Sequence, residues 1–155
     1  MLSAMKPDDS ADTLPPPPGL HWALVLLLGV VTFGFFWDAW FIVQALWARK
    51  VDPSSRALFL YGVGFVLQII CGVEEYHVVE YPVQIAVAAG FAGLLVMLYA
   101  SFSVKDTLAA YTTSVTGRPT YLSGLMTIFF SEVYLQYHMN KVRSLQRSAV
   151  LAGVR

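Results

Sequence analysis

The sequence predicts an all-α membrane protein with three transmembrane helices and a C-terminal amphipathic helix that is interfacial or re-entrant. The 155-residue chain is 57% hydrophobic but only 13% charged, whereas soluble domains carry about 25% charged residues. Its mean hydropathy is +0.60. Three uncharged apolar runs are separated by short charged stretches. Each run is close to the about 20 residues that a helix needs to cross a bilayer.

Residues 1–19 are expected to be a disordered, Pro-rich N-terminal tail. The segment carries three Asp and the four prolines of 15–18, and it has no apolar core of its own. Consecutive prolines favour the extended polyproline II conformation. We therefore expect residues 20–147 to form the helical membrane domain and residues 148–155 to form a C-terminal tail.

The first transmembrane helix is expected over residues 20–39. Tryptophan is enriched at lipid–water interfaces, so four tryptophans are interpreted as lipid-interface residues: Trp22, Trp37, Trp40 and Trp47. A carboxylate inside a membrane would indicate a functional site. Because Asp38 lies between two of these tryptophans, we interpret it as solvated at the level of the headgroups.

The second and third transmembrane helices are expected over residues 57–73 and 83–104. Asp52 and Pro53 favour a helix start before the second, because Asp caps helices and Pro fits their first turn. Gly117 closes an amphipathic extension of the third. Small residues spaced by four let two helix backbones approach closely in lipid. They are Ala86, Ala89, Gly90 and Gly93, and we expect this face to pack against a helix of another membrane protein or a second copy.

The stretch 74–82 between these helices contains a weak candidate metal site, Glu74, His77 and Glu80. The Glu-x-x-His spacing is that of di-iron bundle proteins, which need two such pairs and two further Glu. This chain has only three histidines. Haem ligation by His21 and His138 has equally little support. We therefore interpret the stretch as a solvated acidic hairpin and predict no metal or other cofactor.

The last segment, YLSGLMTIFFSEVYLQYHMNKVR at 121–143, is apolar at its start and polar at its end. Polar residues recur at spacings of three and four: Thr120, Ser123, Thr127, Ser131, Tyr134 and His138. An amphipathic helix with a basic end can lie on anionic lipid, and Lys141, Arg143 and Arg147 supply that end. We expect one helix over 120–147, with a re-entrant or fourth spanning helix over 121–139 as the alternative.

The distribution of Lys and Arg favours three spans over four. Cytoplasmic segments of membrane proteins are enriched in Lys and Arg. Four spans would place five of the ten basic residues on each side, whereas three spans would place nine on one side. We therefore expect a bacterial cytoplasmic membrane protein with its N-terminus outside and its C-terminus inside.

Four segments, PPPGLHWALVLL, WARKVDPSSRAL, LSGLMTIFF and YLQYHMN, resemble a group of small bacterial integral membrane proteins of unknown function. The resemblance covers most of the chain beyond the tail and implies no activity. In that group small residues or Pro precede the Tyr-x-Gln-Tyr-His element, whereas this chain has Ser131-Glu132. That difference argues against a general catalytic role for Glu132 and leaves Gln136, Tyr137 and His138 as polar residues of interest.

The function expected from these features is non-enzymatic, with no catalytic residues. We expect a scaffold or accessory subunit whose partners are the lipid bilayer and the helices of other membrane proteins, or a second copy. Nucleic acid is not expected, because ten basic and ten acidic residues cancel. The alternative is a membrane-embedded enzyme or transporter subunit that uses Glu132 and His138, or the 74–82 hairpin.

Overall fold

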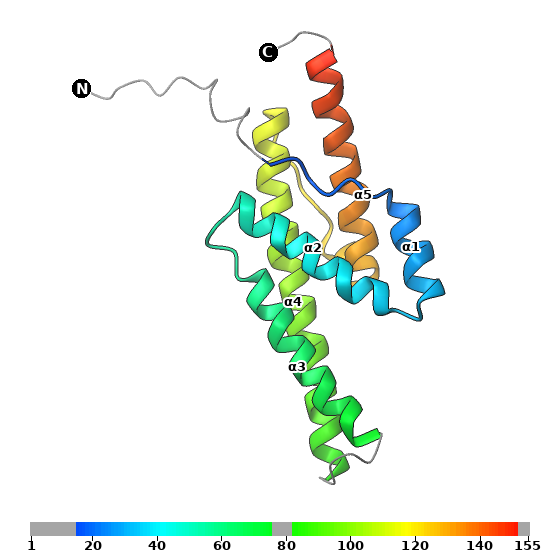
Figure 1. Ribbon diagram of the computed structural model, residues 1–155. Helices are drawn as coiled ribbons and strands as arrows, with labels where there is room; N and C mark the ends of the chain where they lie inside the picture. The colour runs from blue at the N-terminus through cyan, green and yellow to red at the C-terminus, as the bar shows by residue number, and fades with distance from the viewer. Residues whose placement is uncertain (1–14, 76–81, 152–155) are drawn as a thin grey trace, which may run out of the picture.

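The computed structural model describes residues 15–75 and 82–151, and it contains five α-helices and no strand within them (Figure 1). The helices are α1 (Trp22–Val31), α2 (Phe35–Val51), α3 (Ala57–Glu75), α4 (Val83–Thr116) and α5 (Gly124–Leu151). The all-α prediction is therefore confirmed for the described residues.

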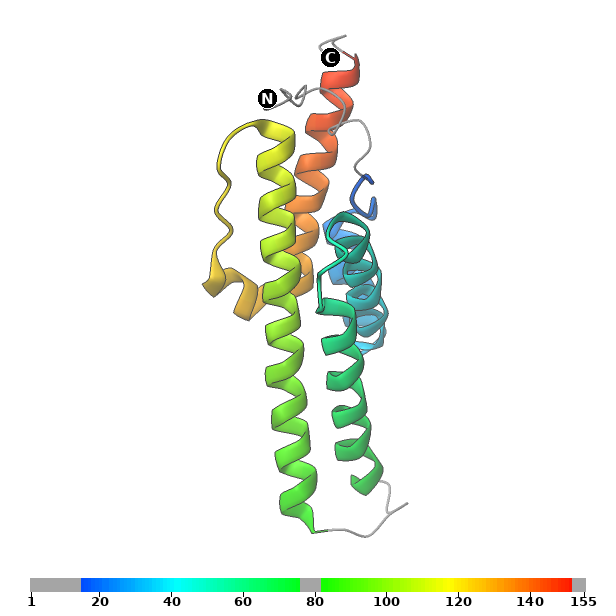
Figure 2. The same ribbon diagram turned by 90° about the vertical axis from the view of Figure 1, so that its left-hand side faces the viewer.

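Helices α3 and α4 form an antiparallel pair along the long axis of the molecule (Figure 2). The pair is tight because small residues meet: a Cβ added to Gly93 would lie 3.1 Å from the carbonyl oxygen of Gly64. Ala86 and Gly93 are buried, while Ala89 and Gly90 are partly buried. The small-residue face that we expected to meet another protein thus packs against α3 of the same chain.

Helix α4 is the one helix among the described residues that is long and apolar enough to cross a membrane. It runs without interruption from Val83 until Gly117 adopts a left-handed conformation (φ 65°) and caps it, as expected of that glycine. Helix α1 and the apolar part of α3 are shorter. The prediction of three transmembrane helices is not confirmed.

The predicted continuous helix over residues 20–39 is wrong, because the chain reverses at residues 32–34. Phe33 and Gly34 both have positive φ angles, 51° and 96°, and such backbone ends a right-handed helix. The indole of Trp37 then folds back onto α1, where its Nε1 donates to the carbonyl oxygen of Val25 at 3.2 Å. Helices α1 and α2 therefore form a short hairpin.

Residues 15–19 are packed, although we expected them in a disordered tail. The carbonyl oxygen of Pro15 accepts hydrogen bonds from Trp47 Nε1 at 3.1 Å and from the Tyr111 hydroxyl at 3.2 Å. Residues 1–14 lie outside the described residues. Pro15 thus lies at the same end of the molecule as the last turns of α4 and the C-terminal half of α5 (Figure 1). The orientation of the two termini across a membrane stays a prediction.

Helix α5 starts later in the sequence than predicted, and it is not continuous. It begins at Gly124 rather than near Thr120, and its backbone is non-helical at Ser131 (φ 10°, ψ −93°), which kinks it. The Ser131 hydroxyl donates to the Ser101 hydroxyl at 2.7 Å, so this contact holds the kink against the middle of α4. Beyond it, α5 runs beside the second half of α4 (Figure 2).

The second helix start also differs from the prediction. Asp52 does not cap α3. It ends α2, and its carboxylate accepts hydrogen bonds from Ser54 in the turn that follows. Helix α3 starts at Ala57.

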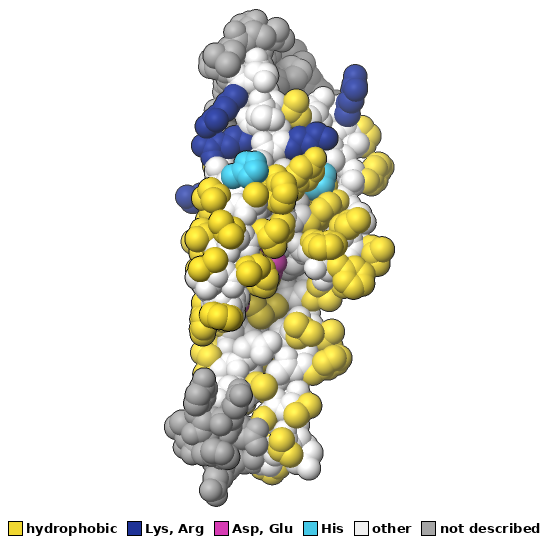
Figure 3. Space-filling view, turned by 90° about the vertical axis from the view of Figure 1, so that its right-hand side faces the viewer, with side chains coloured by type: hydrophobic (Ala, Val, Ile, Leu, Met, Phe, Trp, Pro, Cys, Tyr) yellow, Lys and Arg dark blue, Asp and Glu magenta, His cyan; other side chains and the backbone are white. Residues whose placement is uncertain are grey.

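Most of the basic residues of the described chain lie toward one end of the molecule. Arg49 and Lys50 end α2, Arg118 follows α4, and the basic residues of α5 lie in its C-terminal half. Figure 3 shows the resulting band of Lys and Arg on one face, with histidine and then a broad hydrophobic area beyond it. At the opposite end, where α3 finishes and α4 begins, the described residues 57–75 and 82–104 contain no Lys or Arg.

Candidate functional site

A cavity of about 510 Å³ lies where α2, α3, α4 and the kink of α5 meet. It is mostly apolar but contains two carboxylates, an amide and two hydroxyls. Its lining residues are Trp37, Asp38, Phe41, Phe65, Gln68, Leu94, Met97, Leu98, Ser101, Ile128, Phe129, Ser131 and Glu132. Several of them are among the exposed residues, so the cavity opens at the surface.

The fold places the two carboxylates on different helices. Asp38 lies in the first turn of α2, where the helix dipole favours a negative charge. Glu132 directly follows the kink at Ser131. The reversal at residues 32–34 and the kink are therefore the two features that bring Asp38 and Glu132 to one cavity.

A series of hydrogen-bonded hydroxyl groups lies at one side of this cavity. Ser131 donates to Ser101 at 2.7 Å, and the Ser101 and Tyr61 hydroxyls lie 3.1 Å apart. Ser101 in turn donates to the carbonyl oxygen of Met97 at 3.1 Å. This series ends at a backbone acceptor, so it fixes the kink of α5 beside Glu132.

The cavity offers its two carboxylates no described cation. None of its described lining residues is Lys, Arg or His. A carboxylate in largely apolar surroundings is stable when it is protonated or meets a hydrogen-bond donor or cation. Asp38 and Glu132 can therefore hold a proton, or accept a hydrogen-bond donor or cation from outside the described residues.

Gln136, a residue of interest in the sequence, connects three segments of the fold. Its side chain is fully buried. Its Nε2 donates to the carbonyl oxygens of Pro18 at 3.0 Å and Leu20 at 2.7 Å. Its Oε1 accepts from Trp40 Nε1 at 3.1 Å. All of these contacts are internal, so Gln136 has a structural role.

His138 does not meet Glu132 in this cavity. Its ring packs edge-on against Tyr134 and Tyr137, with centroids 4.6 and 5.3 Å away. Burial lowers the pKa of His138, and the positive charge of Lys141 lowers it further. Tyr137 is 47% exposed. His138 is not among the residues that line the cavity of Glu132.

The described residues contain no group of three His, Cys, Asp or Glu side chains that could hold a metal ion. Within the weak candidate metal site, Glu74 lies in the last turn of α3. His77 and Glu80 lie outside the described residues, so the hairpin stays a prediction. The two histidines considered for haem have local roles, because His21 Nδ1 accepts from the backbone of Ala23 at 3.3 Å and His138 packs between tyrosines.

The four tryptophan side chains mainly make contacts within the chain. Trp47 is only 4% exposed, and its Nε1 donates to the carbonyl oxygen of Pro15. The indoles of Trp37 and Trp40 donate to Val25 and Gln136 within the chain. Trp22 is partly buried and packs edge-on against Tyr137. Sequence reasoning missed these roles because it treated the four tryptophans as one class.

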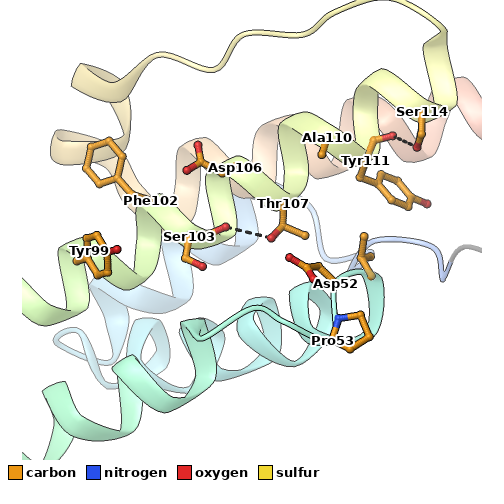
Figure 4. Close-up of a pocket in the computed structure, with 11 residues that line it drawn as sticks. Asp52, Pro53, Tyr99, Phe102, Ser103, Asp106, Thr107, Ala110, Tyr111 and Ser114 are labelled. Carbon is orange, nitrogen blue, oxygen red and sulfur yellow. Dashed lines mark hydrogen bonds between the residues drawn. The ribbon is translucent and has the colours of Figure 1, made fainter.

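A second cavity, of about 650 Å³, lies between the turn joining α2 to α3 and the side of α4 (Figure 4). Its two carboxylates already have partners. Asp52 accepts from the backbone and hydroxyl of Ser54 at 2.9 and 2.6 Å, and Asp106 forms an ion pair with Lys105 at 3.1 Å. Its Thr107 hydroxyl donates to the carbonyl oxygen of Ser103 at 3.1 Å. The Asp38–Glu132 cavity is the better candidate, because its carboxylates lack cationic partners among the described residues.

Over residues 15–75 and 82–151 the protein is therefore all-helical, with one helix long and apolar enough to cross a membrane and with Asp38 and Glu132 at one largely apolar cavity. No family model, curated protein or solved structure matches the chain.

Proposed function

We propose that this protein is an integral membrane protein in which α3 and α4 cross the bilayer. The α1–α2 hairpin and the first turns of α5 enter only part of the way, from the basic side. Residues 83–104 of α4 carry no charge over 22 residues, about 33 Å at 1.5 Å per residue. That length matches a hydrocarbon core of about 30 Å. The uncharged part of α3 packs alongside it.

The length and surface of the α1–α2 hairpin support partial entry. Helix α1 has 10 residues, about 15 Å. The tip of the hairpin is apolar and bare: Phe33 is 94% exposed and Phe35 is 78% exposed. An aqueous surface would leave these rings hydrated, whereas a bilayer solvates them favourably. This arrangement leaves both described ends of the chain on the basic side, which the positive-inside rule assigns to the cytoplasm.

Within that membrane, the protein acts as a scaffold or accessory subunit rather than as an enzyme. The observation that carries this proposal is the open cavity with Asp38 and Glu132 and no described cation. Lipid tails offer no hydrogen bonds, so intramembrane carboxylates normally pair with other groups. The occupant that fits is a transmembrane helix of another protein, with a Lys or Arg facing the carboxylates. Leu94 and Phe129, both exposed at the cavity, would flank that helix.

Site-specific photo-crosslinking in cells tests this proposal. A photoreactive amino acid at Leu94 should give a discrete protein adduct, while the same group at Phe59, exposed on α3 away from the cavity, should not. The adduct at Leu94 should disappear in the Asp38→Asn/Glu132→Gln variant. Lipid adducts alone, or a protein adduct that survives this substitution, would overturn the accessory-subunit proposal.

The carboxylate pair also favours a second candidate, a transporter subunit that binds a proton or cation at Glu132. Purified protein in liposomes would then dissipate an imposed proton or cation gradient without a partner. Glu132→Gln should abolish that flux. Gradients that persist as long as in empty liposomes would exclude this candidate for the isolated chain.

A further inference from the structure

A third hollow, of about 470 Å³, lies between the segment preceding α1 and the C-terminal half of α5. Its lining is polar and basic: Gly19, His21, Asn140, Arg143, Ser144, Arg147 and Ser148. Arg143 and Arg147 are one helical turn apart, so their side chains project from the same side of α5. Two hydroxyl-bearing residues of that helix border the same hollow.

No acidic side chain of the described residues 15–75 and 82–151 neutralises these two arginines. No Asp or Glu is among the described lining residues, and the ion pair of the described chain is Lys105–Asp106. Gly19 lets the Arg143 side chain lie across the N-terminal segment, because a Cβ there would collide with the guanidinium group. The Asn140 side chain ties the same segment to α5, since it donates to the carbonyl oxygen of Leu20 and accepts from the backbone of Trp22, each at 3.0 Å. The hollow is thus a preformed cationic site.

The surface beside the hollow is apolar. Leu24 and Leu27 of α1 are 46% and 56% exposed. Figure 3 shows the basic band directly above a continuous hydrophobic area on this face. A ligand with a phosphate at one end and hydrocarbon at the other would meet both surfaces at once, whereas a free phosphate would use only the hollow.

We propose that this hollow binds the phosphate group of an anionic phospholipid, with the acyl chains lying along α1. Arg143 and Arg147 contact the phosphate oxygens, for which the guanidinium fork is suited. The hydroxyls of Ser144 and Ser148 donate to the backbone carbonyl oxygens of Lys141 and Ser144 at 2.7 and 3.0 Å, so the two arginines are the donors to the headgroup. This inference rests on the membrane location proposed above, but it does not depend on the carboxylate cavity or its partner.

Native mass spectrometry of the full-length protein in detergent, titrated with phosphatidylglycerol, tests the site. Each basic residue near an anionic headgroup contributes about 1 kcal/mol, so Arg143→Gln/Arg147→Gln should weaken binding about 30-fold. The single variant Arg147→Gln, which changes an exposed side chain, should weaken it about fivefold. The matched control, Arg49→Gln/Lys50→Gln, also removes two exposed charges and should change binding by less than about threefold.

Three outcomes would overturn the inference: unchanged binding in both arginine variants, equal losses in the matched control, or equally tight binding of phosphatidylcholine. Inorganic phosphate distinguishes the two sources of the ligand. Lipid binding that persists in about 10 mM phosphate supports a phospholipid, because the acyl chains add affinity that free phosphate lacks. Displacement by phosphate would overturn the lipid assignment. Carbonate extraction of the same proteins reports membrane insertion separately, so loss of the lipid site is distinguishable from failure of the proposed membrane location.

Discussion

Gln136 of α5 donates a 2.7 Å hydrogen bond from its side-chain Nε2 to the backbone carbonyl oxygen of Leu20. This contact joins the last helix to the segment that precedes the first. The same side chain accepts from Trp40 of α2. The proline-rich segment, the α1–α2 hairpin and α5 therefore share one buried connection.

Removing this connection should destabilise the protein. Gln136→Ala would leave the Trp40 N–H and the Pro18 carbonyl oxygen without these partners, and each buried group left unpaired costs about 1–3 kcal/mol. We expect a loss of about 2–3 kcal/mol, measured by denaturation in detergent. Gln84→Ala, at an exposed position of α4, is the matched control and should be nearly neutral. Equal stability of the two variants would show that the connection contributes little.

Gly93 should be essential for the approach of α3 to α4. A Cβ there lies 3.1 Å from both the carbonyl oxygen of Gly64 and Cβ of Leu67, and backbone atoms yield little. Gly93→Leu should therefore cost about 1–3 kcal/mol through overpacking. A Cβ added to Gly62 meets nothing within 4 Å, so Gly62→Leu serves as the control. Comparable melting temperatures for Gly93→Leu and Gly62→Leu would contradict the observed packing.

Cysteine labelling should place both ends of the described chain on one side of the membrane. In a Cys71→Ala background, exposed single cysteines at Pro16 and Ser148 should react with an impermeant reagent from the same side, and a cysteine at Val83 from the opposite side. The structure brings Pro15 against Trp47 and Tyr111 at the basic end, which is the reason for this expectation. Reaction of Pro16→Cys and Ser148→Cys from opposite sides would restore the three-span arrangement predicted from the sequence.

Local sequence was sufficient for much of the helical framework. The uncharged run 83–104 predicted the apolar part of α4, and Gly117 was correctly expected to end that helix because glycine readily adopts the left-handed conformation. The run 57–73 likewise predicted α3. The small residues of α4 were recognised as a packing face, although nothing in their spacing says which helix they meet.

Tertiary structure decided where the chain turns and which polar residues meet. The run at 23–37 is apolar enough to suggest a continuous helix, but the left-handed backbone at Gly34 and the indole of Trp37 on Val25 fold it into a hairpin. The kink at Ser131 depends on the hydroxyl of Ser101, which lies 30 residues away. Because local patterns do not record long-range contacts, the flanking tryptophans led us to place Asp38 at the headgroups, and the sequence named no partner for Glu132. The two long-range contacts instead bring Asp38 and Glu132 to the same cavity.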